Sequence, residues 1–222
     1  MGSGALPILR TPLILLAAAD LAVLAFHLRP WSQIPSLPGN GATGIDPLVC
    51  LVAYIGLFLW LGGSRAQEAR RALGAATLLG FIAGLALVAQ IAIGARLPFP
   101  QAGLLEIRFL SFTIAAILCG IAGLRGARAV GNVALGLLCG LWSAMVSCLM
   151  ACAAVLAEMG RVAAAPISSD PWKQYEGLAV GNQAMQSLVH SLDMARAYLI
   201  IGPLVGASVG LIFARIAPPR KS

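Results

Sequence analysis

Long runs of apolar residues alternate with shorter polar segments along the whole chain. A helix that crosses a bilayer needs about 20 consecutive, mainly apolar residues, and six runs approach or exceed that length. Turn-length polar segments separate most of the runs, as in antiparallel helices joined by short connections. The pattern therefore predicts an all-α, integral membrane bundle of about six transmembrane helices. The predicted spans cover residues 13–28, 48–61, 72–95, 107–124, 130–156 and 197–216.

The segments between these spans differ in length and polarity. Residues 64–71 and 125–128 are short and basic, and we expect each to form a turn. Residues 157–196 form the longest polar segment. Its second half places polar and apolar residues on opposite sides of a helix, which predicts an amphipathic helix that runs into the last span. No other boundary divides the chain, so residues 1–222 are expected to form one transmembrane domain.

Composition agrees with this class. Hydrophobic residues make up 59% of the chain and charged residues 10%, whereas soluble domains are about half apolar and about a quarter charged. The formal net charge of +7 would suit nucleic-acid binding if the basic residues were clustered, but they stand singly or in small groups between apolar runs. Basic residues placed in this way set membrane topology. The lipid bilayer is the expected partner, and nucleic acid is not.

The placement of basic residues also predicts an orientation. If both termini are cytoplasmic, the inner segments hold nine basic residues and one acidic residue, and the outer segments hold six of each. This distribution satisfies the positive-inside rule. We therefore expect a multi-pass protein of a bacterial-type inner (plasma) membrane with both termini in the cytoplasm and residues 157–196 outside.

The first apolar run has a second interpretation. Arg10, a short apolar stretch and the three alanines 17–19 are typical of a secretory signal peptide that is cleaved after Ala19. The apolar run continues to Phe26, however, which is longer than a signal core with so early a cleavage site. A retained first helix is therefore favoured over a cleaved one.

Small residues recur at four-residue spacing in three of the predicted spans. This spacing allows the backbones of membrane helices to approach closely. Packing within the chain is the favoured interpretation, and a seam for a homo-oligomer or a membrane partner subunit is the alternative. Pro203 lacks an N–H and frees the carbonyl of Leu199, so we expect a kink in the last span. The glycines concerned are Gly80, Gly84, Gly136, Gly140, Gly202, Gly206 and Gly210.

A few polar side chains stand out as candidates for function. Asp20 lies inside the first apolar run, where a carboxylate is costly, and His27 follows on the same helix face two turns later. The predicted orientation places His27 and His190 at the outer surface, with Asp193 on the same helix face as His190. Together with Gln90 they form a candidate binding or proton-relay site. The alternatives are a polar helix face wetted by solvent and, for Asp20, a hydrogen bond to a neighbouring helix.

Two imidazoles at one membrane surface would also suit a haem iron or a divalent metal. The five cysteines form no CxxC pair, so neither a zinc site nor a disulfide framework is indicated. Motifs of nucleotide-binding proteins, serine hydrolases and zinc proteases are absent, which disfavours an enzyme. The leading hypothesis is a small-solute or ion transport component, or an accessory subunit of a membrane complex, without a cofactor. The alternative is a haem- or metal-binding electron-transfer subunit that uses His27 and His190.

Overall fold

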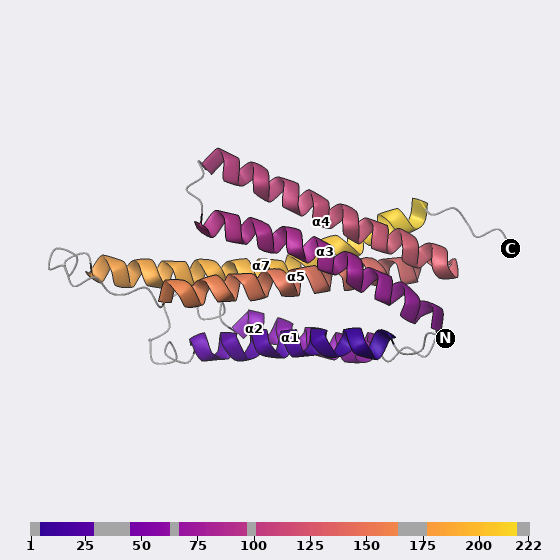
Figure 1. The fold of residues 1–222 in the computed structure, drawn as a ribbon, viewed down its shortest axis with the longest axis horizontal. Helices are drawn as coiled ribbons and strands as arrows, with labels where there is room; N and C mark the ends of the chain where they lie inside the picture. Colours follow the sequence, from indigo (N-terminus) through magenta and orange to yellow (C-terminus); the bar gives the residue numbers. More distant parts are fainter. Residues whose placement is uncertain (1–4, 29–44, 63–66, 97–100, 164–176, 217–222) are drawn as a thin grey trace.

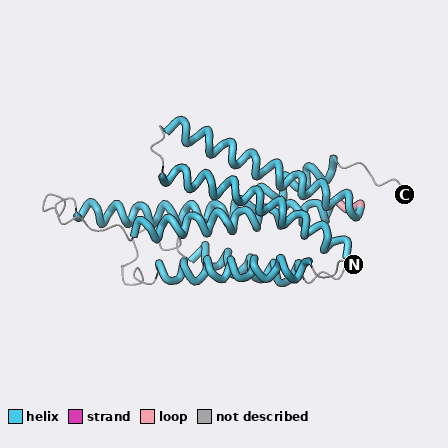
Figure 2. The backbone as a smooth tube through the Cα atoms, viewed as in Figure 1, coloured by secondary structure: helices cyan, strands magenta, loops and turns pink. Residues whose placement is uncertain are grey.

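The computed structural model describes residues 5–28, 45–62, 67–96, 101–163 and 177–216. These residues form six α-helices and contain no strand (Figure 2). The all-helical class predicted from the apolar runs is therefore confirmed for this part of the chain. The helices are α1 (Ala5–Leu28), α2 (Ile45–Gly62), α3 (Gln67–Arg96), α4 (Gln101–Val130), α5 (Val133–Ala163) and α7 (Gly177–Ile216).

Four of the described helices are long and apolar enough to cross a membrane. They contain the apolar stretches Ala69–Arg96, Gly103–Ala129, Val133–Glu158 and Ser191–Ile216. The apolar parts of α1 and α2, Thr11–Phe26 and Pro47–Trp60, are shorter than the roughly 20 residues of a typical span. The structure thus supports a membrane-embedded protein, and six spans remain a prediction.

The helices pack in three layers, which Figure 1 shows from the side. The α3–α4 hairpin lies on one side of the α5–α7 pair, and the α1–α2 hairpin lies on the other. Helix α5 is the central element, because it packs against α1, α3, α4 and α7. Residues buried inside the protein make up 61% of its apolar window, against 33% in each of α3, α4 and α7.

Two helix boundaries differ from the sequence prediction. Residues 125–128, expected to form a turn, lie inside α4, and the chain turns at Gly131 instead, which has a φ of 71°. Arginine and alanine are good helix formers, so the helix continues until a glycine accepts the left-handed conformation. Asn132 then caps α5, because its Oδ1 accepts a hydrogen bond of 2.8 Å from the N–H of Ala134. Similarly, Arg70 and Arg71 of the predicted turn at residues 64–71 belong to α3.

Helix α7 runs without a break from Gly177 to Ile216. The second half of segment 157–196 and the last apolar span are therefore one helix, longer than the span itself. Residues 164–176 of the same segment lie outside the described residues.

Glycines bring α4, α5 and α7 into backbone contact. A Cβ atom on Gly140 of α5 would lie 2.6 Å from the carbonyl oxygen of Gly206 and 2.7 Å from the Cα of Gly210, both in α7. A Cβ on Gly123 of α4 would lie 2.5 Å from the carbonyl oxygen of Gly210. Real Cβ atoms do not approach other atoms so closely, so a side chain at these positions would push the helices apart.

The remaining glycines of the four-residue spacings also face neighbouring helices. Gly80 and Gly84 of α3 face Ser143 and Met150 of α5, where a Cβ would lie 2.5 Å from the Ser143 carbonyl oxygen and from the Met150 sulfur. A Cβ on Gly136 would meet Ala214, and one on Gly202 would meet the sulfur of Cys148.

Buried polar groups in the centre of the bundle are mostly hydrogen-bonded. Trp142 of α5 donates from Nε1 to the hydroxyl of Thr77 in α3 at 2.8 Å, and that hydroxyl donates to the carbonyl oxygen of Leu73 at 2.8 Å. The indole also meets the ring of Phe58 of α2 edge to face, with centroids 4.9 Å apart. This cluster joins α2, α3 and α5 with its donors satisfied.

A second buried hydrogen bond joins α2 to α7. The hydroxyl of Tyr54 donates to the carbonyl oxygen of Leu199 at 3.1 Å. In a regular helix this carbonyl would accept the N–H of residue 203, which is Pro203 and has none. Tyr54 therefore supplies the donor that the proline removes.

Candidate functional site

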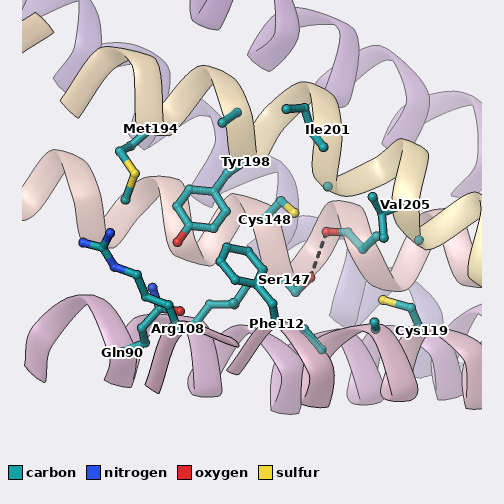
Figure 3. Close-up of a pocket in the computed structure, with 17 residues that line it drawn as sticks. Gln90, Arg108, Phe112, Cys119, Ser147, Cys148, Met194, Tyr198, Ile201 and Val205 are labelled. Atoms are coloured by element: carbon teal, nitrogen blue, oxygen red, sulfur yellow. Dashed lines mark hydrogen bonds between the residues drawn. The ribbon is translucent and has the colours of Figure 1, made fainter. Parts of the chain in front are cut away.

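A cavity of about 310 Å³ lies between α4 and α7, with α3 and α5 behind it (Figure 3). We call it the α4–α7 cavity. On α4 its lining extends from Arg108 to Cys119, and on α7 from Met194 to Gly206. At 1.5 Å per residue, each stretch is about 17 Å long. The volume is at the lower end of the range of small-molecule sites, about 300–1,000 Å³.

The cavity exists because α4 and α7 touch at one end and diverge toward the other (Figure 1). The contact is the backbone approach of Gly123 and Gly210, next to Gly120 and Phe213. Toward the beginning of α4 the helices separate, and small lining residues such as Ala115 leave the space between them unfilled. The Gly123–Gly210 contact therefore holds α4 and α7 together at one end, and the cleft lies where the two helices diverge from it.

The mouth of the cavity lies among exposed apolar side chains. Phe112 of α4 is 49% exposed, and Ile201 and Val205 of α7 are 58% and 45% exposed. The ring of Phe112 stacks on Tyr198 with centroids 5.9 Å apart. Phe109, also on α4, is exposed as well. In a membrane such a surface would face lipid, and the mouth would then open sideways into the bilayer.

The cavity has one polar end, formed by Gln90 of α3, Arg108 of α4 and Tyr198 of α7. Gln90 and Tyr198 are each 5% exposed, and their side chains interact, yet Gln90 Oε1 and the Tyr198 hydroxyl form no full hydrogen bond with each other or with any other described residue. An unsatisfied buried polar group costs about 1–3 kcal/mol. Two such atoms at one end of one cavity mark that end as a place for a polar group of a ligand.

Figure 3 shows the Tyr198 hydroxyl directed toward Gln90 and Arg108. The three side chains lie at a similar depth along the bundle. Within the apolar stretches, Gln90 is six residues before Arg96, Arg108 is five residues after Gly103, and Tyr198 is seven residues after Ser191. Each is therefore about 8–11 Å from the same end of these stretches.

The polar side chains in the deeper part of the cavity have hydrogen-bond partners within the protein. The hydroxyl of Ser147 donates to the carbonyl oxygen of Ala144 at 2.9 Å, the bond drawn in Figure 3. The thiol of Cys119 is 3.8 Å from the hydroxyl of Ser143. Leu87 and Cys148 complete this part of the lining. The cavity is thus polar at one end and apolar in its body.

Asp20 lies on the buried face of α1 and not in the lining of the α4–α7 cavity. It shares that face with Leu13, Ala17 and Leu24, which are buried at helical spacing. It is 4% exposed, its Oδ2 has no hydrogen-bond partner in the described part of the chain, and it lies within electrostatic range of Cys152 of α5. The structure therefore places Asp20 and Gln90, which the sequence analysis grouped together, at different positions in the bundle.

The other predicted site residues are only partly described. His27 lies in the last turn of α1 and His190 lies within α7, but their side chains are outside the described residues. Asp193 is exposed on α7, next to the lining residue Met194. Among the described residues, no three histidine, cysteine, aspartate or glutamate side chains are grouped as metal ligands. The haem or metal hypothesis stays a prediction that depends on His27 and His190.

Sequence reasoning singled out Gln90 but missed Arg108 and Tyr198. The predicted spans hide this common depth, because Arg108 and Tyr198 are each the second residue of spans 107–124 and 197–216, whereas Gln90 lies five residues before the end of span 72–95. A common depth is required, though not sufficient, for three side chains of different helices to meet.

Comparisons with known proteins do not add a family to this description. The four apolar helices indicate a membrane-embedded protein, and the site rests on its own geometry. A scan with protein-family models, a search of curated proteins and a search of solved structures each gave no match.

Proposed function

We propose that the chain is an inner-membrane protein that binds a small amphiphilic or apolar solute in the α4–α7 cavity. It acts either as a transport component for that solute or as an accessory subunit of a larger membrane complex. The observation that carries the proposal is that the exposed apolar side chains of Phe112, Ile201 and Val205 line the cavity, so that in a bilayer it would open sideways to lipid.

The lining supports a solute of this kind better than an ion. Ion sites in membranes are built from rings of carbonyl oxygens or charged side chains that replace the hydration shell. The body of this cavity is instead formed by residues such as Leu87, Ala115 and Phe112. A solute that enters from lipid also needs no aqueous path, so the lateral mouth is sufficient for access.

The source of affinity follows from the solvent. In the bilayer an apolar chain is already surrounded by hydrocarbon, so moving it into the cavity releases no hydrophobic free energy, and association depends on packing and hydrogen bonds. We therefore expect the cavity body to select for shape, and the polar end at Gln90, Arg108 and Tyr198 to supply most of the binding energy.

The proposal is tested with a neutral diazirine-bearing long-chain alcohol added to the protein in phosphatidylcholine nanodiscs. After photolysis, peptide mass spectrometry should find the label concentrated on α4 and α7 around Phe112, Ile201 and Val205. Ala116 is half-buried and lines the cavity, so Ala116→Phe should fill it and reduce this labelling several-fold. Ala89 is exposed on α3 outside the lining, so Ala89→Phe is the matched control and should leave labelling unchanged. Label spread evenly over exposed positions, unchanged by Ala116→Phe, would refute cavity binding.

The two roles named in the proposal are separated by a flux measurement. In proteoliposomes with a fluorescent phospholipid, a transport component makes inner-leaflet fluorophore accessible to external dithionite, and Ala116→Phe slows that exchange. Specific labelling of the cavity without protein-dependent exchange supports the role of an accessory subunit.

A further inference from the structure

The unsatisfied atoms at the polar end of the α4–α7 cavity specify a ligand more closely than its shape does. We infer that Gln90, Arg108 and Tyr198 recognise the acidic, hydroxyl-bearing phosphate headgroup of a membrane lipid, with one acyl chain lying in the body of the cavity. This inference rests on the proposed function, because it assumes that the cavity accepts an amphiphile from the bilayer.

The first step is the division of the cavity into a polar end and an apolar body. Of the side chains with oxygen or nitrogen atoms in the lining, Ser147 is satisfied by a backbone carbonyl at 2.9 Å. The remaining three, Gln90, Arg108 and Tyr198, all lie at one end. A ligand that satisfies them must carry its polar atoms at one end and a chain at the other, which is the form of a lipid.

The second step is the hydrogen-bond chemistry of the two buried groups. The Tyr198 hydroxyl and the Gln90 side chain lie close enough to interact but form no full hydrogen bond with each other. A phosphate oxygen offers the Tyr198 hydroxyl a stronger, charged acceptor, and an alcohol on the headgroup then donates to Gln90 Oε1. Both side chains are 5% exposed, so water from the surface reaches them poorly and a bound headgroup is the better source of partners.

The third step is the charge of Arg108. Its side chain is exposed at the polar end of the cavity and forms no ion pair with any described residue. Glu106 is two residues away on α4, and side chains at that spacing do not face each other on a helix. A guanidinium binds phosphate through paired hydrogen bonds that are stronger than neutral ones. The polar end therefore favours an anionic headgroup over a zwitterionic or neutral one.

The fourth step is depth. The polar end lies about 8–11 Å inside the end of the apolar stretches of α3, α4 and α7. Long basic side chains at such positions extend toward the headgroup layer while their alkyl stems stay in the apolar region, and tyrosine is enriched at the same level. The headgroup can thus stay near its normal depth in the leaflet while its chain occupies a cleft about 17 Å long.

The volume limits how much of the lipid is enclosed. At about 310 Å³, the cavity holds one chain segment with the adjoining part of the headgroup. The exposed residues Phe112, Ile201 and Val205 leave the second chain in the surrounding bilayer. The ligand is accordingly a lipid that enters sideways from the leaflet and is only partly enclosed by the cavity.

The test compares phosphatidylglycerol with phosphatidylcholine of identical acyl chains. The protein is extracted from mixed nanodiscs into mild detergent, and the retained lipids are counted by native mass spectrometry. We expect phosphatidylglycerol to be enriched about tenfold, as one charge-assisted hydrogen bond provides. Arg108→Gln and Gln90→Leu should each reduce the enrichment about three- to tenfold.

Matched controls separate site binding from general attraction of charge. Arg96 is exposed at the end of α3 and does not line the cavity, so Arg96→Gln removes one positive charge without touching the site and should keep the enrichment. Because Arg108 is exposed, Arg108→Gln should fold normally. An equal loss in Arg96→Gln and Arg108→Gln would overturn the inference in favour of diffuse attraction.

Other outcomes distinguish this inference from the proposed function. If Ala116→Phe displaces both lipids equally and no headgroup is preferred, headgroup recognition is wrong and cavity binding stands. If Ala116→Phe displaces neither, both proposals fail. Soluble glycerol phosphate at millimolar concentration should leave the retained lipid unchanged, and its displacement of the lipid would show that the site reads a free phosphate.

Discussion

The hydrogen bond between Tyr54 and the carbonyl oxygen of Leu199 gives the sharpest test of how the bundle is held together. We consider the substitution Tyr54→Phe, which removes the hydroxyl and keeps the ring. The ring is 4% exposed and lies edge to face with Phe58 at 6.1 Å, so its packing should persist. The carbonyl of Leu199 would lose the donor that replaces the missing N–H of Pro203.

The size of the effect follows from this geometry. Hydrogen bonds between membrane helices contribute about 0.6 kcal/mol on average and at most about 1.7 kcal/mol. The average is low because groups that lose one hydrogen-bond partner usually find another. The buried carbonyl of Leu199 has no such alternative, since Pro203 lacks the N–H that would bond to it in the helix. We therefore expect Tyr54→Phe to lower the free energy of unfolding by about 1.5 kcal/mol, near the upper limit. For a chain of this length the melting temperature should fall by about 3–6 °C.

The assay is a double-mutant cycle, measured by unfolding in mixed micelles with increasing dodecyl sulfate. Pro203→Ala restores an N–H at residue 203, which can bond to the carbonyl of Leu199 within the helix. In that background, Tyr54→Phe should cost less than about 0.5 kcal/mol, so the two changes should couple by about 1 kcal/mol. Equal costs of Tyr54→Phe in both backgrounds would refute the reasoning, because the carbonyl would then not depend on the tyrosine.

Three further predictions address packing, the cavity and the buried carboxylate. Gly210→Ala should destabilise the protein by about 1–3 kcal/mol, because its Cβ would lie 2.8 Å from the Cα of Gly140. Gly74→Ala, where a Cβ meets nothing within 4 Å, should stabilise it by about 0.5–1 kcal/mol in the same unfolding assay. Gln90→Leu should change the melting temperature of lipid-free protein in detergent little, because it removes one unsatisfied buried atom but also the side chain that interacts with the Tyr198 hydroxyl; a large fall would contradict that view of Gln90. Asp20→Asn should leave photolabelling of the α4–α7 cavity unchanged, because Asp20 lies on the buried face of α1 outside the lining; a loss of labelling would show that Asp20 is coupled to the cavity.

The helices could be predicted from the sequence because long, continuous apolar runs identify helices that can cross a membrane. Their ends were less certain where local charge suggested a turn. The basic residues 125–128 continue α4 to Val130, since arginine favours a helix and the chain needs a glycine to leave it. The continuity of α7 from Gly177, by contrast, agrees with the prediction of a helix that runs into the last span.

The cavity could not be predicted in the same way. The sequence identifies Gln90 as an unusual polar residue in a span, but its relation to Arg108 and Tyr198 depends on how α3, α4 and α7 are rotated and crossed. Those rotations follow from close contacts such as Gly123 with Gly210, and one sequence does not say which glycine meets which. For the same reason the sequence does not show that Asp20 of α1 faces α5 and lies apart from Gln90 of α3.

The backbone contact of Gly123 with Gly210 has a mechanical consequence. It lies at one end of α4, and Arg108 lies 15 residues away, about 22 Å along the helix. The backbones of α4 and α7 are in direct contact at this point, so it would be the pivot of any tilt of α4 against α7. A tilt of about 5° would move the polar end by about 2 Å over that arm. A small change in the crossing angle at the glycines would thus narrow or widen the cleft at its polar end, where a ligand would be held or released.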